Sequence, residues 1–319
     1  MEQGENQSVN VTFHAGEVPV AYKLDYEPCL FNTQAYRLLQ AKDGWREFHF
    51  LHPEKKIVLV SVYFHVLDDV ARSPLRAPFG GFEYSNTATP AMLFGFIKLT
   101  EEAFRKSNVN TIEILCPCEL YSNAQSFVTI GLLNRGFQNV EAEPGACILV
   151  DEIPLQEKMS KDKRARLRQC VKAGLTFKEI NLNKLEEVYR FISTCRMEQG
   201  RTLSMTFSEL ATTVERLPQS FFTVGVFDDK HMIGACICVR VRSNVVYTFY
   251  SAHDSQYDAI SPRVFLLSNL YDWSLKNKIS ILDLGTSALD GKPNFPLLDF
   301  KMRVGATLTP KYKFRKTLA

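Results

Sequence analysis

The chain has 319 residues, of which 45% are hydrophobic and 23% are charged, and its formal net charge is +3. This length exceeds the usual size of a single core, so we expect two domains of about 150 residues each. No apolar run reaches the roughly 18 residues of a membrane span, and the N-terminal MEQGENQSVN is too polar and acidic for a secretory leader, so we expect a cytoplasmic protein.

The first half of the chain alternates strand-like and helix-like segments. Residues 46–52 and 56–66 are rich in aromatic and β-branched residues and predict two strands. Residues 89–99 open with Thr-Pro and continue as an apolar helical pattern, and a hydroxyl residue followed by proline is favoured at a helix start. A strand at 110–117 and a helix that ends in LLNRGF at 132–137 complete this half.

The second half repeats this order. We expect three strands at 220–228, 232–242 and 244–252, followed by a helix at 261–271 that opens with Ser-Pro. A strand at 279–285 and a helix that ends in KMRVGA at 301–306 complete this half. The corresponding prolines, Pro90 and Pro262, are 172 residues apart, and the glycines Gly136 and Gly305 are 169 residues apart. These offsets indicate an internal duplication. Each copy predicts a mixed sheet flanked by helices, which is an α/β or α+β fold.

A basic segment separates the two halves. Residues 158–172 carry seven Lys or Arg against one Asp, which is +6 locally in a chain of +3. We place the boundary just before it, near residue 156, and expect domains at 9–156 and 157–319. Seven cations can meet the phosphates of a nucleotide, a coenzyme or a tRNA, but aromatic residues that would stack on bases are missing. We favour a solvated helix face.

The eight cysteines form no disulfide or metal framework. Cys116 and Cys118, like Cys236 and Cys238, lie two apart in apolar strand-like runs, and neither pair has a second Cys or His pair at zinc spacing. The six histidines form no metal motif either. We expect buried free thiols and no metal.

The order of elements and three short motifs resemble the tandem GNAT fold of the Fem-type (FemAB-like) peptidyltransferases and their uncharacterised bacterial relatives. The segment 160–175 is similar to the opening of their second domain, LLNRGF to the GNAT helix end, and DFKMRVGA at 299–306 to a Phe-Lys-x-x-x-Gly closure. The resemblance implies two GNAT-like domains, the first of them degenerate and on the acceptor side of a cleft. It also implies that the last run, 306–314, crosses to the first domain.

The donor region departs from ordinary GNAT enzymes, which hold the coenzyme A pyrophosphate on a glycine-rich turn before the long helix. The corresponding segment here, SAHDSQYDAISPR at 251–263, contains no glycine. A coenzyme A thioester is therefore one candidate donor, and aminoacyl-tRNA, which Fem-type enzymes use, is the other. The helix start still offers free N–H groups and a positive dipole end, so we place the donor near Ser251, Ser261 and Arg263. An ordinary capped helix without a ligand is the alternative.

In the GNAT arrangement the fourth and fifth strands diverge, and the acyl group lies in the opening. This places Tyr250 as a proton donor, Asp283 as a proton acceptor and Lys301 as a cation that stabilises negative charge. Tyr247 and Arg303 are candidates for binding the substrate. The ordinary alternatives are core or rim tyrosines, a turn cap and a solvated helix face.

The first half offers Glu83 and Tyr84 as acceptor-side candidates, which the resemblance implies. We therefore expect an acyl- or aminoacyl-transferase that moves an acyl group to an amine acceptor in the interdomain cleft, without membrane insertion. The alternative is a catalytically silent binding protein for a phosphorylated metabolite or an envelope precursor.

Overall fold

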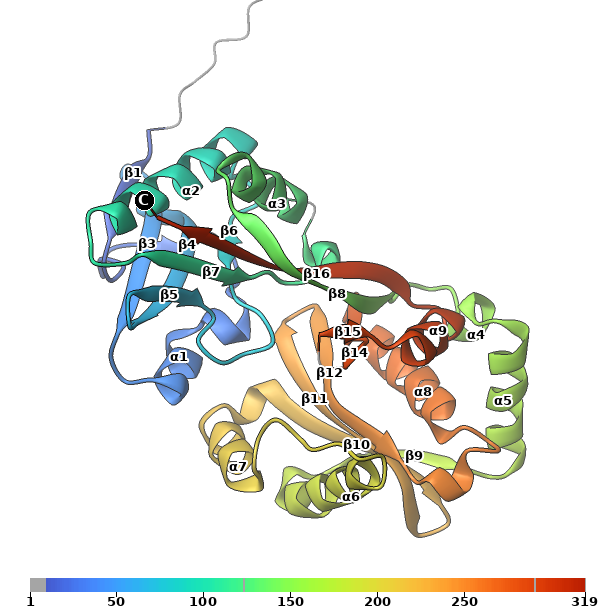
Figure 1. The fold of residues 1–319 in the computed structure, drawn as a ribbon. Helices are drawn as coiled ribbons and strands as arrows, with labels where there is room; N and C mark the ends of the chain where they lie inside the picture. The colour runs from blue at the N-terminus through green and yellow to red at the C-terminus, as the bar shows by residue number, and fades with distance from the viewer. Residues whose placement is uncertain (1–9, 123, 290, 319) are drawn as a thin grey trace, which may run out of the picture. The chain divides into compact units, whose positions relative to one another are not determined.

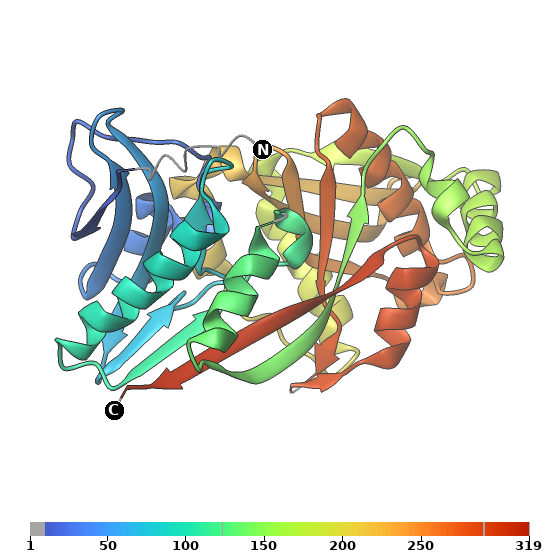
Figure 2. The ribbon, with the colours of Figure 1, turned by 90° about the horizontal axis from the view of Figure 1, so that it is seen from above.

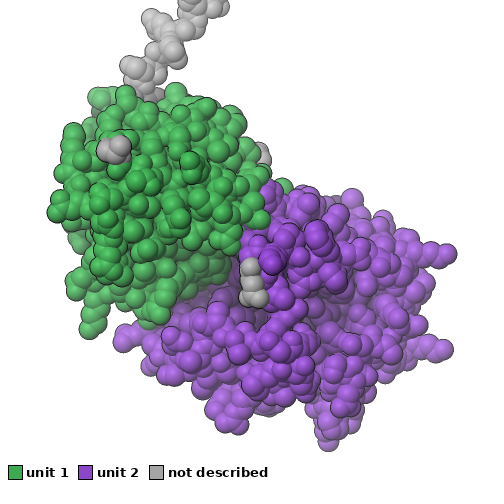
Figure 3. All heavy atoms as spheres, viewed as in Figure 1, with its two compact units in different colours: residues 1–142, 311–319 green, residues 143–310 purple. Residues whose placement is uncertain are grey.

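The computed structural model describes residues 10–122, 124–289 and 291–318 (Figure 1). The chain divides into two compact units, unit 1 with residues 1–142 and 311–319 and unit 2 with residues 143–310 (Figure 3). The division at residue 142 falls inside strand β8 (Gln138–Leu149). The boundary expected near residue 156 follows the repeat instead, because β8 is the last strand of the first copy.

Unit 1 is built on a mixed sheet with the strand order β1-β3-β4-β5-β7-β16, and β2 and β6 also pair with β4. These strands are β1 (Thr12–Ala15), β2 (Lys23–Leu24), β3 (Trp45–His52), β4 (Ile57–Leu67), β5 (Val70–Ser73), β6 (Phe82–Tyr84), β7 (Thr111–Leu115) and β16 (Thr307–Thr317). The helices are η1 (Leu30–Asn32), α1 (Gln34–Gln40), α2 (Pro90–Arg105), η2 (Glu119–Tyr121) and α3 (Gln125–Asn134). Helices α2 and α3 lie side by side (Figure 2).

Helix α2 shows how the sequence positions these elements. The Thr89 hydroxyl accepts a hydrogen bond from the Met92 N–H at 3.3 Å, and Pro90 occupies the first turn, where its missing N–H is harmless. The inward face carries Leu93, Phe96 and other apolar residues at helical spacing, which pack against the strands in the core of unit 1.

Unit 2 is built on parallel and antiparallel strands in the order β8-β13-β12-β11-β10-β9. Besides β8, its strands are β9 (Thr176–Ile180), β10 (Phe221–Asp228), β11 (His231–Arg242), β12 (Val245–His253) and β13 (Ile281–Thr286), with a small hairpin of β14 (Ala288–Leu289) and β15 (Lys292–Pro293). The helices are α4 (Leu155–Lys158), α5 (Lys161–Lys172), η3 (Leu182–Lys184), α6 (Leu185–Met197), α7 (Phe207–Arg216), η4 (Pro218–Ser220), η5 (Ser255–Tyr257), α8 (Pro262–Lys276) and α9 (Phe295–Arg303).

The central strand β11 is covered on both faces. Seven consecutive residues of β11, 233–239, are buried, although alternate side chains of a strand point to opposite faces. Cys236 and Cys238 belong to the core cluster that contains α8, and α6 also contacts β11 and β12. Unit 2 is therefore a three-layer α/β unit, and the expected mixed sheet flanked by helices is confirmed.

The two units repeat one connection. In unit 1, β5 and β7 pair in parallel across α2, and in unit 2, β12 and β13 pair in parallel across α8. Both helices have proline in the first turn, and the helices α3 and α9 are both followed by a glycine with positive φ, Gly136 at 77° and Gly305 at 99°. The tandem organisation expected from the sequence is confirmed in these elements.

Each unit is completed by the closing strand of the other half of the sequence. Residues 313–317 of β16 pair antiparallel with β7 in unit 1, and residues 145–149 of β8 pair with β13 in unit 2. Figure 2 shows the C-terminal end of β16 beside β7. The crossing of the last strand is thus confirmed from Lys311 onward.

Candidate functional site

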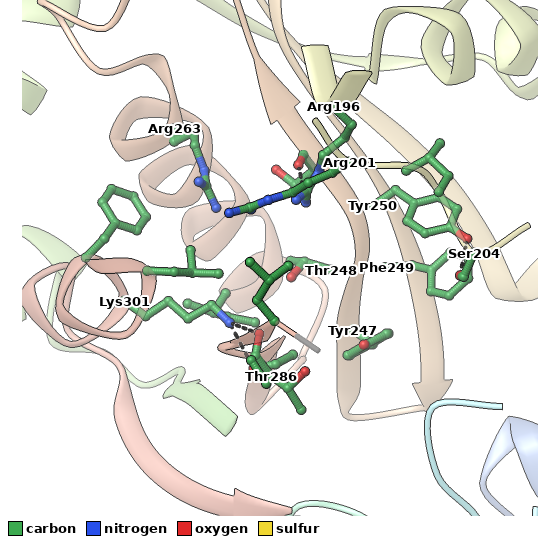
Figure 4. A pocket seen from close by; sticks show the side chains of 18 of the residues that line it. Arg196, Arg201, Ser204, Tyr247, Thr248, Phe249, Tyr250, Arg263, Thr286 and Lys301 are labelled. Atoms are coloured by element: carbon green, nitrogen blue, oxygen red, sulfur yellow. Dashed lines mark hydrogen bonds between the residues drawn. The ribbon is translucent and has the colours of Figure 1, made fainter. Parts of the chain in front are cut away.

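The pocket of interest lies in unit 2, at the point where two parallel strands stop pairing. β12 and β13 are paired at three positions: Val245 with Ile281, Val246 with Leu282, and Tyr247 with Asp283. Beyond the last pair both strands continue, to residues 253 and 286, and their free ends line a cavity of about 400 Å³. The expected opening between the fourth and fifth strands is therefore present (Figure 4).

Five segments supply the lining. They are the end of α6 with the α6–α7 loop, strand β12, the N-terminal half of α8, the end of β13 with β14, and helix α9. The residues that line the pocket are Arg196, Arg201–Ser204, Tyr247–Ser251, Arg263, Leu267, Leu284–Thr286, Ala288, Leu289, Leu297, Phe300 and Lys301.

The structure brings half of the sequence-predicted site residues to this pocket. Tyr247, Tyr250, Ser251, Arg263 and Lys301 line it. Asp283, Ser261, Arg303, Glu83 and Tyr84 lie outside the lining, and the functional roles of all ten residues stay predictions.

Tyr250 on β12 has a restrained hydroxyl. Its oxygen lies 2.6 Å from the Ser204 Oγ and accepts a hydrogen bond from the Met205 N–H at 3.0 Å. Burial raises the pKa of Tyr250, and the hydrogen bond with Ser204 opposes this only in part. Tyr250 is therefore a neutral phenol at physiological pH, which can donate a proton and cannot serve as the resting base.

Lys301 on α9 is only 4% exposed, and its ammonium group donates to the Gly285 carbonyl at 3.0 Å and to the Thr286 carbonyl at 2.8 Å. Both acceptors follow Asp283 at the end of β13, so Lys301 fixes the backbone that forms one wall of the pocket. Phe300 packs against the core of unit 2, whereas Met302 is 48% exposed, because the helical turn directs it away from the core.

Asp283 lies next to the pocket but does not line it. It is buried, and its Oδ1 accepts a hydrogen bond from the Gly285 N–H at 2.6 Å. Gly285 has φ of 71°, and a Cβ there would lie 3.1 Å from the Tyr247 hydroxyl, so a side chain at this position would be strained. Burial and the Asp283 carboxylate both raise the pKa of Tyr247. Tyr247 is therefore neutral and closely packed.

Ser261 and Arg303 lie away from the lining. Ser261 precedes α8 with φ of 59° and makes no capping hydrogen bond with its side chain. Arg303 is exposed and pairs with Asp162 at 2.6 Å and with Asp299 at 3.5 Å. These ion pairs raise the pKa of Arg303 and hold its guanidinium against α5.

Glu83 and Tyr84 belong to unit 1. Glu83 is 1% exposed, and its Oε1 accepts hydrogen bonds from the Cys29 N–H at 3.0 Å and from Asn32 at 2.7 Å. Tyr84 donates to the Gln125 side chain at 3.4 Å. Glu83 therefore has a structural role in organising the segment before α1.

Two residues that the sequence analysis missed, Arg196 and Arg201, also line the pocket. Arg196 donates to the Ser251 carbonyl on β12 at 2.9 Å. Its position was readable, because it follows Leu185, Val188 and Ile192 at helical spacing on the buried face of α6. The sequence analysis therefore identified only Arg263 among the three arginines of the lining.

The pocket is cationic. Its lining has three arginines and Lys301, and among the described residues that line it there is no Asp or Glu. Burial and the neighbouring Arg196 lower the pKa of Arg263 to about 10, and burial and Arg201 lower that of Arg196. Arg196 and Arg263 nevertheless remain charged at neutral pH, so the pocket is suited to an anionic group.

All eight cysteines are free and buried, as expected. Within the described ranges no group of His, Cys, Asp or Glu has an arrangement that could hold a metal ion, and no helix there is long and apolar enough to cross a membrane.

No known family model and no curated protein matches this sequence. Among solved structures, FemX matches with a TM-score of 0.68 and 12% identity, over 92% of this chain and 94% of FemX. The chain has the fold of FemX. The expected resemblance to the Fem-type peptidyltransferases, with their tandem GNAT domains, is therefore confirmed at the level of fold.

Two other solved structures match less closely. The C-terminal domain of a putative lysylphosphatidylglycerol synthetase from Agrobacterium fabrum has a TM-score of 0.53 and 10% identity, over 81% of this chain and 80% of that one. L-PGS from Bacillus licheniformis has a TM-score of 0.50 and 12% identity, over 80% of each chain. At these identities the comparisons describe the fold alone.

Proposed function

We propose that this protein is an acyl- or aminoacyl-transferase that forms an amide on an amine acceptor, with the reacting groups in the unit 2 pocket. The observation that carries the proposal is the divergence of β12 and β13 beyond Tyr247 and Asp283, in a chain with the fold of FemX. The opening is lined by a neutral tyrosine, main-chain groups and cations.

The reaction requires three events at this opening. The amine nitrogen attacks the acyl carbonyl carbon, the new C–N bond forms, and the C–S or C–O bond to the donor breaks. The amine loses a proton, and the leaving thiolate or alkoxide gains one. Negative charge develops on the carbonyl oxygen between these steps, and nearby donors or cations stabilise it.

Tyr250 is the candidate proton donor to the leaving group, because it is neutral and lines the cavity. Lys301 is the candidate for positioning the β13 end through the Gly285 and Thr286 carbonyls, in place of the direct contact with developing charge expected from the sequence. Asp283 is kept as a candidate proton acceptor. Its carboxylate accepts a hydrogen bond from the Gly285 N–H, and Asp283 is the strand partner of Tyr247.

The donor is a coenzyme A thioester or an aminoacyl-tRNA. The segment before α8 has no glycine-rich turn, and its helix starts at Pro262 with Arg263 in the first turn. Arg263 and Ser251 line the pocket, and Ser261 directly precedes the first residue of α8, so we retain these three as candidates for holding the donor. Both donors occur in the cytoplasm, where the proposal places the reaction.

The acceptor is an amine on a small molecule or a precursor. Tyr247 lines the pocket and is a candidate for contacting it. Arg303, Glu83 and Tyr84 are proposed contacts that rest on the resemblance alone.

A catalytically silent binding protein for a phosphorylated metabolite or an envelope precursor is the second candidate function. The observation that favours it is the arginine-rich lining without an acidic residue among the described positions. The two candidates differ in turnover and agree in requiring an anionic ligand.

Calorimetric titration with acetyl-coenzyme A, followed by a thiol-release assay with a panel of amines, tests the proposal. We expect binding and thiol release that depends on an amine. Tyr250→Phe should slow release by about a hundredfold while the variant stays folded, with a melting temperature lowered only by the loss of the bonds to Ser204 and Met205. Tyr257→Phe, which changes a tyrosine outside the lining, is the matched control. Binding with no turnover of any amine supports the second candidate. Absence of binding directs the test to aminoacyl-tRNA, with amide formation on the amine as the readout, because this donor releases no thiol.

A further inference from the structure

Helix α6 ends in a defined turn that brings two arginines together. The Arg201 N–H donates to the Arg196 carbonyl at 2.9 Å, and the Gly200 N–H donates to the Met197 carbonyl at 2.9 Å, with Gly200 at φ of 69°. These two bonds and the left-handed glycine define a Schellman motif. Arg196 and Arg201 therefore occupy its first and last positions, which lie beside each other.

Those two positions usually hold an apolar contact. The same turn ends α9, where they are Lys301 and Ala306. It also ends α3, where they are Leu132 and Phe137, and α5, where they are Cys170 and Leu175. All four of these side chains are buried: Leu132, Phe137, Cys170 and Leu175. At the end of α6 the apolar pair is replaced by two arginines, although two like charges side by side cost stability. The negative end of the helix dipole offsets part of that cost.

The arginines of this turn are incompletely paired with protein groups. Arg196 donates to the Ser251 carbonyl at 2.9 Å, while its Nε is buried without a hydrogen-bond partner. The Arg201 side chain has no hydrogen bond or ion pair within the described ranges. Both guanidinium groups retain donors for another molecule.

Arg263 faces them from α8. Figure 4 shows the three guanidinium groups converging in the pocket from two different helix ends. The Arg263 guanidinium lies 4.9 Å from the centre of the Phe300 ring, which holds it in place. The Asp258 carboxylate, which raises the pKa of Arg263, is exposed and bonded to His253 at 2.6 Å, so it compensates Arg263 only partly.

We infer that Arg196, Arg201 and Arg263 form a binding site for a phosphoryl group that carries two or more negative charges. A guanidinium presents its N–H groups as a planar fork, which matches two oxygens of a phosphate. Three such forks from different directions suit a tetrahedral group with several oxygens, whereas one carboxylate can be bracketed by a single fork. The inference rests on the second candidate function and deepens it, because it names the residues and the charge of the phosphoryl group, and it can hold with or without transfer activity.

The phosphoryl group can be a terminal phosphate monoester or part of a diphosphate bridge. Inorganic phosphate represents the first and pyrophosphate the second. Dimethyl phosphate represents the singly charged diester of a lipid or nucleic acid backbone, and malonate represents a dicarboxylate. We expect phosphate or pyrophosphate to bind at least tenfold more tightly than the other two, because the site has three cations to offset.

The test is calorimetric titration of the full chain with these four anions at constant ionic strength. We expect Arg201→Gln to weaken binding of the preferred phosphate by about tenfold or more, since it removes one charged fork. Arg263→Gln should do the same from the other wall, while Arg216→Gln, an exposed arginine on α7 outside the lining, should leave the affinity unchanged.

A second measurement separates a binding role from a structural one. Without phosphate, Arg201→Gln should keep or raise the melting temperature, because it relieves repulsion within the pocket. With phosphate, the wild type should gain more thermal stability than the variant by mass action. Failure of phosphate and pyrophosphate to bind, equal binding of malonate, or unchanged affinity in Arg201→Gln would each overturn the inference. None of these results bears on whether an amine is acylated.

Discussion

Lys301 is a buried cation that is satisfied by the backbone. Its ammonium group donates to the Gly285 and Thr286 carbonyls, and both oxygens would lose these donors if the charge were removed. The sequence indicated that this lysine projects toward the strand of Asp283. It did not indicate that main-chain oxygens would receive it, because the path of the chain after β13 depends on the left-handed Gly285 and on packing against Tyr247.

We expect Lys301→Met to lower the free energy of unfolding by about 1–3 kcal/mol, because it leaves buried carbonyl oxygens without a donor. It should also reduce any transfer rate by displacing the pocket wall. Arg303→Met, on the same helix but exposed, should cost less than about 1 kcal/mol, since surface ion pairs contribute little. Urea unfolding of both variants measures the difference, and equal losses would contradict the structural role of Lys301.

At the scale of elements, one turn with a left-handed glycine recurs at four helix ends in the described part of the chain. α3, α5, α6 and α9 all end in a left-handed glycine, in the segments LLNRGF, CVKAGL, RMEQGR and KMRVGA. The sequence analysis recognised the first and last of these as helix ends. It overlooked RMEQGR, where the spacing of Gly200 from Arg196 was the available signal. Which of these ends face a cavity depended on tertiary packing and was not readable.

Helix α2 is joined to the last strand by a buried charge. The Glu101 carboxylate is 1% exposed and accepts hydrogen bonds from Lys316 at 2.6 Å and from Arg105 and Arg135, each at 2.9 Å. Burial alone would raise the pKa of Glu101, but these three cations lower it overall. A carboxyl group with a lowered folded pKa stabilises the fold above its unfolded pKa of about 4.3, and this contribution is lost as the pH falls through the folded pKa.

Glu101→Gln should therefore reduce the free energy of unfolding by about 1–3 kcal/mol at pH 7, with part of the effect screened because Arg105 and Arg135 are partly exposed. The difference from wild type should shrink as the pH is lowered below about 4. Denaturant titrations between pH 3 and 7 would show this. Glu102→Gln, the exposed neighbour, is the control, and a difference that stays constant with pH would refute the assignment.

At the scale of the whole molecule, the sequence repeat predicted the two tandem copies and the helix and strand order within them. It did not predict where the compact units would divide, because that division follows strand pairing and not the repeat. β8 closes the first copy in the sequence but contributes residues 145–149 to the sheet of unit 2, and β16 contributes residues 313–317 to unit 1. Only the family resemblance pointed to the crossing of the last strand, since nothing in a strand's composition specifies its partner.

Neither copy should fold as a complete unit by itself. Without residues 311–319, β7 would lose its antiparallel partner, Glu101 would lose Lys316, and the core of unit 1 would lose the fully buried Phe314. We expect a chain that ends at Pro310 to show faster amide hydrogen exchange in β7 and little change in β11, at the centre of unit 2. Because such a truncation can fail to fold, Phe314→Ala is the second variant, expected to cost about 3–5 kcal/mol through the cavity it leaves. Exchange in β7 that stayed as slow as in the full chain would show that β16 is not required to hold unit 1 together.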